Sequence, residues 1–112
     1  MVRVRNQSRD AVLADAVTVA DTSATRNAGL LQREGLQPGE GLWLVPCQSV
    51  HTFFMKFPID LVYLDKRRRV RKLCHAVPPW RISACWAHSV LELPAHSVAP
   101  TGTQIGDQLQ IE

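Results

Sequence analysis

Four polar residues stand within an otherwise apolar stretch near the middle of the chain: His51, Thr52, Lys56 and Asp60. Their neighbours between residues 51 and 65 include every Phe and the only Tyr of the sequence. A soluble domain buries such a stretch, so each of its polar groups must find a hydrogen-bond partner or face a cavity. Polar groups on an apolar wall are typical of sites that orient a small ligand. We therefore predict that these four residues bind a small molecule or a peptide.

The same residues allow other interpretations. Asp60 could instead accept hydrogen bonds from nearby backbone amides, and Lys56 could extend its ammonium group into water. A hydrolase using His51 and Asp60 is a further alternative, which requires both side chains within hydrogen-bond reach of one bound molecule. No recognisable catalytic signature accompanies them, so we favour a binding module over an enzyme and predict no catalytic residue.

The stretch from Val77 to Ala87 contains two consecutive prolines and predicts a long loop. Trp80 and Trp86 lie in this loop and are candidates for lining a groove. We therefore add Trp80 and Arg81 to the ligand-binding candidates.

Each of the three cysteines has a histidine nearby, in the pairs Cys47 and His51, Cys74 and His75, and Cys85 and His88. Zinc needs about four converging N or S donors, and no pair has the close Cys-x-x-Cys spacing of a zinc site. A Cys85–His88 nucleophile would lack a third group to orient the base. We predict no metal and no cofactor, and expect the odd number of thiols to be reduced.

Basic residues are concentrated in one segment of the chain. The net charge is +3, yet six of the 13 Lys and Arg residues lie between positions 66 and 72, which leaves seven against ten acidic residues elsewhere. A hairpin tip of this kind could bind phosphates in a salt-dependent way, so polyanion or nucleic-acid association is the second functional hypothesis. The alternative is a solvated tip that discourages edge-to-edge aggregation. The polyanion-binding candidates are Lys66, Arg67, Arg68, Arg69, Arg71 and Lys72.

The overall composition is that of an ordinary folded protein. At 112 residues the chain predicts a single globular domain, 1–112, in which 1–16 is an edge strand or a loosely held N-terminal segment. No apolar run approaches the roughly 20 residues of a membrane span, and the basic N-terminus lacks a following apolar segment. We expect a cytoplasmic monomer that does not associate with membranes.

Hydrophobic periodicity predicts a chain dominated by strands. The N-cap candidates at 21–23 precede a short helix at about 23–31, which must dock on the sheet to be stable. The expected fold class is α+β and predominantly β, a compact barrel-like antiparallel or mixed sheet with this helix packed on its side. The expected strands are short ones within 2–20, at 2–4, 12–14 and 17–20, then 42–45, 51–55, 59–64, 69–76, 89–93 and 108–111.

Five blocks of the sequence form a recognisable series. They are Ala28-Gly29-Leu30-Leu31, Gly41-Leu42-Trp43-Leu44, His51-Thr52-Phe53-Phe54-Met55-Lys56-Phe57-Pro58-Ile59-Asp60-Leu61-Val62-Tyr63-Leu64-Asp65, Leu91-Glu92-Leu93-Pro94-Ala95 and Gly106-Asp107. In this order they closely resemble the widespread bacterial and archaeal family called domain of unknown function 192. The resemblance covers roughly residues 17–111 and implies a compact, β-rich α+β domain with no established activity. The chain departs from the family pattern at Arg69 and His96, where the family usually has Gly.

Overall fold

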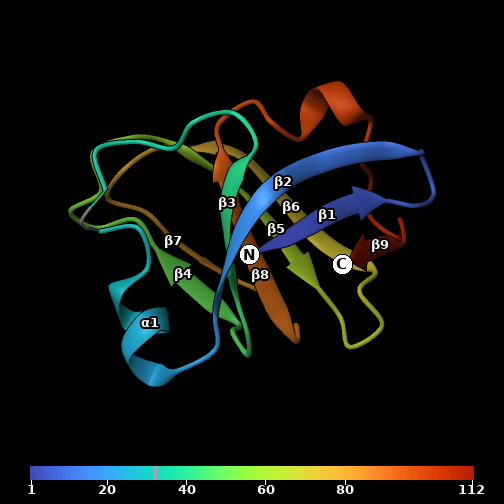
Figure 1. Ribbon diagram of the computed structural model, residues 1–112. Helices are drawn as coiled ribbons and strands as arrows, with labels where there is room; N and C mark the ends of the chain where they lie inside the picture. Colours follow the sequence, from blue (N-terminus) through green and yellow to red (C-terminus); the bar gives the residue numbers. More distant parts are fainter. Residues whose placement is uncertain (32) are drawn as a thin grey trace.

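The computed structural model describes residues 1–31 and 33–112 and is built around one curled sheet (Figure 1). The sheet has the strand order β6-β5-β8-β3-β2-β1-β9, in which only the β2–β3 pair is parallel. Its strands are β1 (Val2–Asn6), β2 (Ala11–Ala20), β3 (Glu40–Leu44), β5 (Ile59–Leu64), β6 (Val70–Val77), β8 (Ser89–Pro94) and β9 (Leu109–Ile111). A two-stranded sheet of β4 (Ser49–His51) and β7 (Ile82–Ala84), a helix α1 (Ser23–Ala28) and a 3₁₀ turn η1 (Ala99–Thr101) complete the fold. The predicted class, predominantly β with one short helix, is confirmed.

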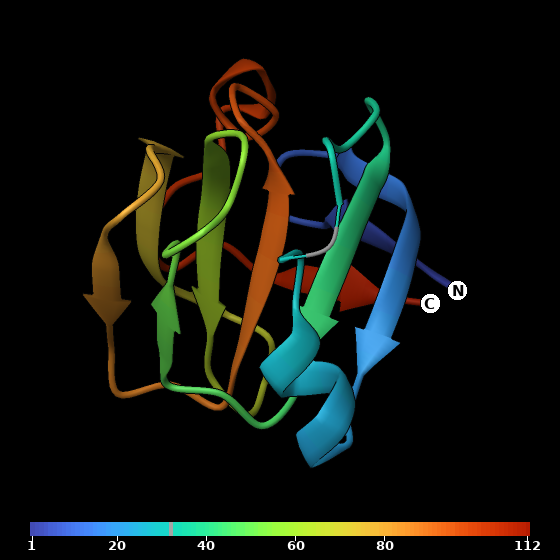
Figure 2. The same cartoon turned by 90° about the vertical axis from the view of Figure 1, so that its left-hand side faces the viewer.

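The curled sheet separates two apolar cores. Side chains alternate between the faces of a strand, so Val62 and Leu91 point into the curl, whereas Leu61 and Val90 point to the opposite face. That opposite face is covered by the segment that follows α1, through Leu30, and by the chain from β4 to Met55 with its partner β7. Figure 2 shows this side of the molecule, with α1 at the lower end of the sheet. Because both faces are covered, every residue of β5 is buried.

The two edge strands of the curled sheet meet at one end. Arg69, just before β6, forms a single antiparallel bridge with Gln108, just before β9. The Val70 amide donates to the Asp107 carbonyl at 2.9 Å, and the Leu109 amide donates to the Arg68 carbonyl at the same distance. The sheet is therefore a half-barrel that is joined by a few hydrogen bonds rather than by a full ladder.

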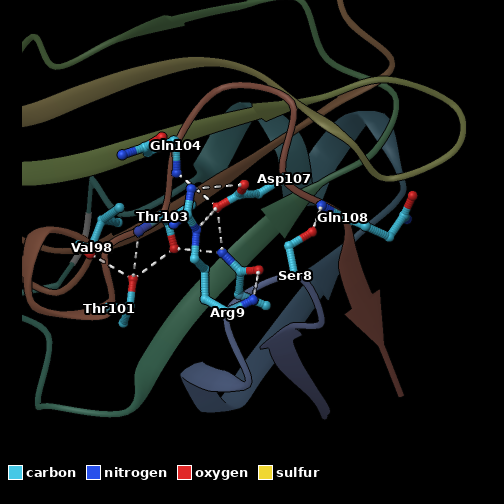
Figure 3. A network of polar contacts seen from close by, with 9 residues as sticks. Ser8, Arg9, Val98, Thr101, Thr103, Gln104, Asp107 and Gln108 are labelled. Carbon is cyan, nitrogen blue, oxygen red and sulfur yellow. Dashed lines mark hydrogen bonds and ion pairs between the residues drawn. The ribbon is translucent and has the colours of Figure 1, made fainter.

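A buried polar network holds the end at which these edges meet (Figure 3). One oxygen of Asp107, Oδ2, accepts hydrogen bonds from Asn6 Nδ2 at 3.0 Å, Arg9 Nε at 3.0 Å and the Gln104 amide at 2.9 Å. Asn6 Nδ2 also donates to the Thr103 hydroxyl at 2.9 Å. The hydrogen bonds and ion pair from Arg9, helped by those from Asn6 and Gln104, lower the pKa of Asp107 to about 2. This carboxylate thus ties the β1–β2 turn to the segment before β9.

Two predicted elements near the middle of the chain were wrong. The expected strand 51–55 is instead β4, which ends at His51, because Phe54 adopts the left-handed region with φ of 65° and turns the chain away. The expected loop 77–87 contains β7, which pairs with β4. Strands 59–64 and 89–93 lie where they were predicted, as β5 and β8.

The N-terminal elements also differ in detail from the predictions. Helix α1 begins after Thr22, whose side chain forms a capping box with Thr25, and it ends by Gly29, which has φ of 48°. It is therefore shorter than the expected 23–31. Strand β1 lies between β2 and β9 rather than at an edge of the sheet.

The Asp107 network yields a stability prediction. We expect Asp107→Asn to lower the free energy of unfolding at pH 7 by about 1–3 kcal/mol, because it removes a charged acceptor of several buried hydrogen bonds. The pKa is lowered on folding, so this stabilisation is present above about pH 4 and is lost as the pH falls towards 2. Urea unfolding at several pH values measures both effects.

The control is Asp10→Asn, which removes the exposed partner of Arg5. Its effect should stay below about 1 kcal/mol, as is usual for surface ion pairs. Equal losses in both variants at pH 7 would contradict a special role for Asp107.

Candidate ligand-binding cavity

A cavity of about 530 Å³ lies between the covered face of the sheet and the elements that cover it. One wall is the end of α1 and the residues after it, and the other is the segment from Pro46 to His51. Glu92 of β8 contributes a carboxyl group to this lining. The apolar part of the lining comes from Leu30, Leu31, Leu44, Val50 and Met55.

The strand register places Glu92 in the middle of an apolar layer. On β8, Leu91 and Leu93 point into the curl, so Glu92 points to the opposite face. Its partners on the two neighbouring strands are Leu42 of β3 and Leu61 of β5. The sheet itself therefore offers no polar side chain to this carboxyl group.

Glu92 is buried without a hydrogen bond among the described residues. The residue is only 3% exposed, and Oε1 has no donor. Burial in these surroundings raises the pKa of Glu92 to about 7. A buried carboxyl whose pKa is displaced towards neutrality, in the wall of a cavity, is a recognised mark of a functional site.

The end of α1 lies directly over this carboxyl group. A Cβ atom placed on Gly29 would be 3.8 Å from Glu92 Oε1, and the positive φ of Gly29 disfavours a side chain there. The helix is held in place by Arg26, which donates from Nη1 to the Val45 carbonyl at 3.3 Å. Gly29 thus allows the helix end to form a lid of backbone over Glu92.

Cys47 is one of several other polar residues in the wall, among them Arg26 and Gln48. Its Sγ donates to the Ser49 carbonyl at 3.1 Å, and burial raises the pKa of its thiol. The thiol is therefore in its neutral form at pH 7 and is not an activated nucleophile.

Of the residues predicted from the sequence, His51 lines this cavity. Thr52, by contrast, is 1% exposed and supports the loops around it. Its hydroxyl donates to the Pro78 carbonyl at 2.7 Å and accepts from the Arg81 amide at 2.9 Å. These bonds join the segment after β4 to the segment before β7.

Asp60 lies away from the cavity lining and is fully buried. Its carboxylate accepts hydrogen bonds from the amides of Ala76 at 2.8 Å, His96 at 3.2 Å and Val98 at 3.0 Å. A ligand role for Asp60 stays a prediction, and its geometry favours the structural alternative. His51 lines the cavity and Asp60 does not, and a hydrolase that uses both residues stays a prediction.

Lys56 and Trp80 lie outside the cavity lining as well. Lys56 forms an exposed ion pair with Glu34. Trp80 packs against Phe53 and Phe54, with ring centroids 5.9 and 4.8 Å apart, and Arg81 is exposed beside it. Phe53 in turn stacks on His51 at 5.2 Å, so this aromatic cluster adjoins the cavity through His51.

The residues that the structure describes contain no group of three or more His, Cys, Asp or Glu side chains placed to hold a metal ion. The six cations of residues 66–72 lie at the β5–β6 turn and along the start of β6. Three of them pack or bond within the protein: Arg68 lies over the Trp43 ring, Arg69 donates to Gln108 and Lys72 donates to the Ala84 carbonyl.

Glu92 was not singled out from the sequence. The available signal was one acidic residue inside the apolar run 89–93, within a block shared with the resembling family. Whether such a residue has a hydrogen-bond partner depends on the strands and the helix that surround it, and these come from distant parts of the chain.

Comparisons with known proteins agree on one family. The sequence profile of the DUF192 family, described as "Uncharacterized ACR", matches residues 3–111. A UPF0127 protein of Thermococcus sibiricus is 29% identical over 96% of this chain and 73% of its own length. No helix among the described residues is long and apolar enough to cross a membrane.

Two crystal structures share the fold. A protein of unknown function from Novosphingobium aromaticivorans has a TM-score of 0.80 and 24% identity, over 97% of this chain and 82% of that one. A protein from Sinorhizobium meliloti, named provisionally as a transcription regulator, has a TM-score of 0.83 and 23% identity, over 98% and 91% of the two chains.

The buried carboxyl group yields a prediction on the pH dependence of stability. The pKa of Glu92 is higher in the folded than in the unfolded chain, so its favourable contribution is present below about pH 4.5 and is lost as the pH rises through about 7. We compare the free energy of unfolding of Glu92→Gln with that of the unmodified protein at each pH. Between pH 4.5 and pH 8 the difference should move by about 3 kcal/mol in favour of the variant, because only the unmodified protein loses the contribution of Glu92. Urea unfolding across this range measures the difference.

Glu34→Gln is the matched control, since Glu34 is an exposed glutamate. Its effect should change little between these pH values. A stability difference for Glu92→Gln that is the same at pH 4.5 and pH 8 would show that Glu92 titrates normally.

Proposed function

Since this chain belongs to the uncharacterised DUF192 family, we propose a function from its own cavity: the protein is a binding module for a small organic molecule. The observation that carries the proposal is Glu92, a buried carboxyl group in the cavity wall whose Oε1 has no donor among the described residues. A ligand that donates a hydrogen bond would give Glu92 Oε1 the partner that it lacks.

The energetics support this role over a structural one. Burying a carboxyl group without a donor destabilises the folded state, and a Leu or Met of similar size would pack against Leu42 and Leu61 at no such cost. Asp60, another buried carboxyl group, has three backbone amide donors. Glu92 therefore does not stabilise the fold in the way that Asp60 does.

The lining defines the class of ligand. Apolar side chains such as Leu30, Leu44 and Met55 favour a ligand with a hydrophobic body. Glu92 favours a hydrogen-bond donor on that body, and in its ionised form it favours a cationic group such as a primary ammonium. We therefore propose that the ligand is a small amine with an apolar substituent.

The proposal refines the site predicted from the sequence. His51 and Met55 bring the stretch 51–60 to the cavity, and the aromatic cluster around Trp80 extends from His51 along the surface. Three free thiols suit a reducing compartment, so we propose that the protein acts in the cytoplasm and as a monomer.

The ligand class can be tested by an NMR titration of the ¹⁵N-labelled protein with short-chain alkylamines, and with alcohols and carboxylates of the same chain length. We expect amines to shift the amide signals of residues 26–31, 47–51 and 92. Their affinity should rise between pH 6 and pH 8, because Glu92, with a pKa of about 7, becomes ionised over this range while the amine stays protonated.

Glu92→Gln should abolish this pH dependence and weaken amine binding at pH 8 by at least about tenfold, since a charged hydrogen bond is lost. Ala28→Phe, which adds a ring to the cavity lining and keeps Glu92, should block all ligands. Glu34→Gln is the control and should bind as the unmodified protein does. Amine binding that is insensitive to both Glu92→Gln and Ala28→Phe would refute the proposed site.

A further inference from the structure

The surface around residues 66–72 shares no lining residue with the cavity and carries positive charge that no ion pair among the described residues neutralises. Ion pairs among the described residues join Arg5 to Asp10, Arg9 to Asp107 and Lys56 to Glu34, and none involves residues 66–72. Within this segment Lys66, Arg67, Arg69 and Arg71 are exposed. No residue lines both this surface and the Glu92 cavity.

Two of these cations share an open hollow with a tryptophan. Lys66 and Arg71 line a hollow of about 190 Å³ together with Trp86, whose side chain is 80% exposed. So exposed an indole presents a face on which a nucleic-acid base can stack. The hollow therefore combines two cations with a free aromatic face.

The one carboxylate of this hollow is already engaged. Asp65 Oδ1 accepts hydrogen bonds from the amides of Arg67 at 2.8 Å and Arg69 at 2.9 Å, and it shapes the β5–β6 turn. It offsets one of the nearby positive charges and leaves an excess of cations. Since the chain outside residues 66–72 is acidic on balance, an anion is attracted to this end of the molecule in preference to others.

We propose that Lys66, Arg71 and Trp86 form a binding surface for single-stranded nucleic acid. The ammonium and guanidinium groups contact successive phosphates, and the indole of Trp86 stacks on a base. A single strand is required because the bases of a duplex are stacked on one another and offer no face to Trp86. An acidic peptide would satisfy the cations but would leave the tryptophan without a role.

Fluorescence anisotropy with a labelled oligothymidylate of about 12 nucleotides, at about 50 mM salt and over a salt series, tests the electrostatic part. We expect Lys66→Ser/Arg71→Ser to reduce the slope of log affinity against log salt by about 1.4, or about 0.7 for each lost phosphate contact. Arg3→Ser/Arg33→Ser removes the same charge elsewhere and should leave the slope unchanged. Equal effects of the two double variants, or no binding by the unmodified protein, would overturn the proposal.

Tryptophan substitutions test the stacking part. Trp86→Leu should weaken binding at least about fivefold without changing the salt slope, as expected for loss of one stacked base. Trp80→Leu alters the other exposed tryptophan and should have no effect. Duplex DNA that binds as tightly as the single strand, or a poly-glutamate peptide that competes fully while Trp86→Leu binds normally, would overturn single-strand recognition.

Discussion

Burial of the central strands on both faces is the constraint on which the rest of the structure depends. All residues of β5 are buried, and so are most of those of β8. A sheet that curls around one core exposes a second apolar face, which must be covered by other elements. Here that cover consists of two three-residue strands, β4 and β7, and of irregular segments such as those at Leu30 and Met55. So small a cover leaves part of the face open, and the cavity beside Glu92 is that part.

Irregular segments border the sheet on both faces, and polar side chains hold them in place. Thr52 bonds the segment after β4 to Pro78 and Arg81, and Asp60 bonds the end of β6 to the residues after β8. The backbone amide of His96 donates to Asp60, and His96 adopts the left-handed region with φ of 70°. This conformation explains why a glycine would be favoured at that position. Thr52 and Asp60, which the sequence predicts as ligand-binding residues, thus hold irregular backbone in place.

The parts of the fold that could be predicted are those whose signal is local. Strands β5 and β8 are continuous apolar runs bounded by turn residues or by proline, and such runs are recognisable without knowledge of their neighbours. The segment 51–55 is equally apolar, yet Thr52 and the backbone of Arg81 determine its course, and this contact joins residues 29 positions apart. Strand β7 is short and Ile82 is 70% exposed, so the sequence there has no strand pattern. His51 and Glu92 are both polar among apolar residues in the sequence, and what sets Glu92 apart, the missing donor to Oε1, depends on the packing of distant segments.

Asp60 and Glu92 show why composition alone does not locate a site. They lie on adjacent, paired strands, where Asp60 is opposite Leu93 and Glu92 is opposite Leu61, and both are buried. Irregular segments on the side of Asp60 bring three amides to its carboxylate, whereas on the side of Glu92 the layer above ends at Gly29 and provides no donor among the described residues. Burial therefore costs little for Asp60 and raises the pKa of Glu92 to about 7. The group that remains free to exchange a proton or to bind a donor near neutral pH is the one that the fold does not use.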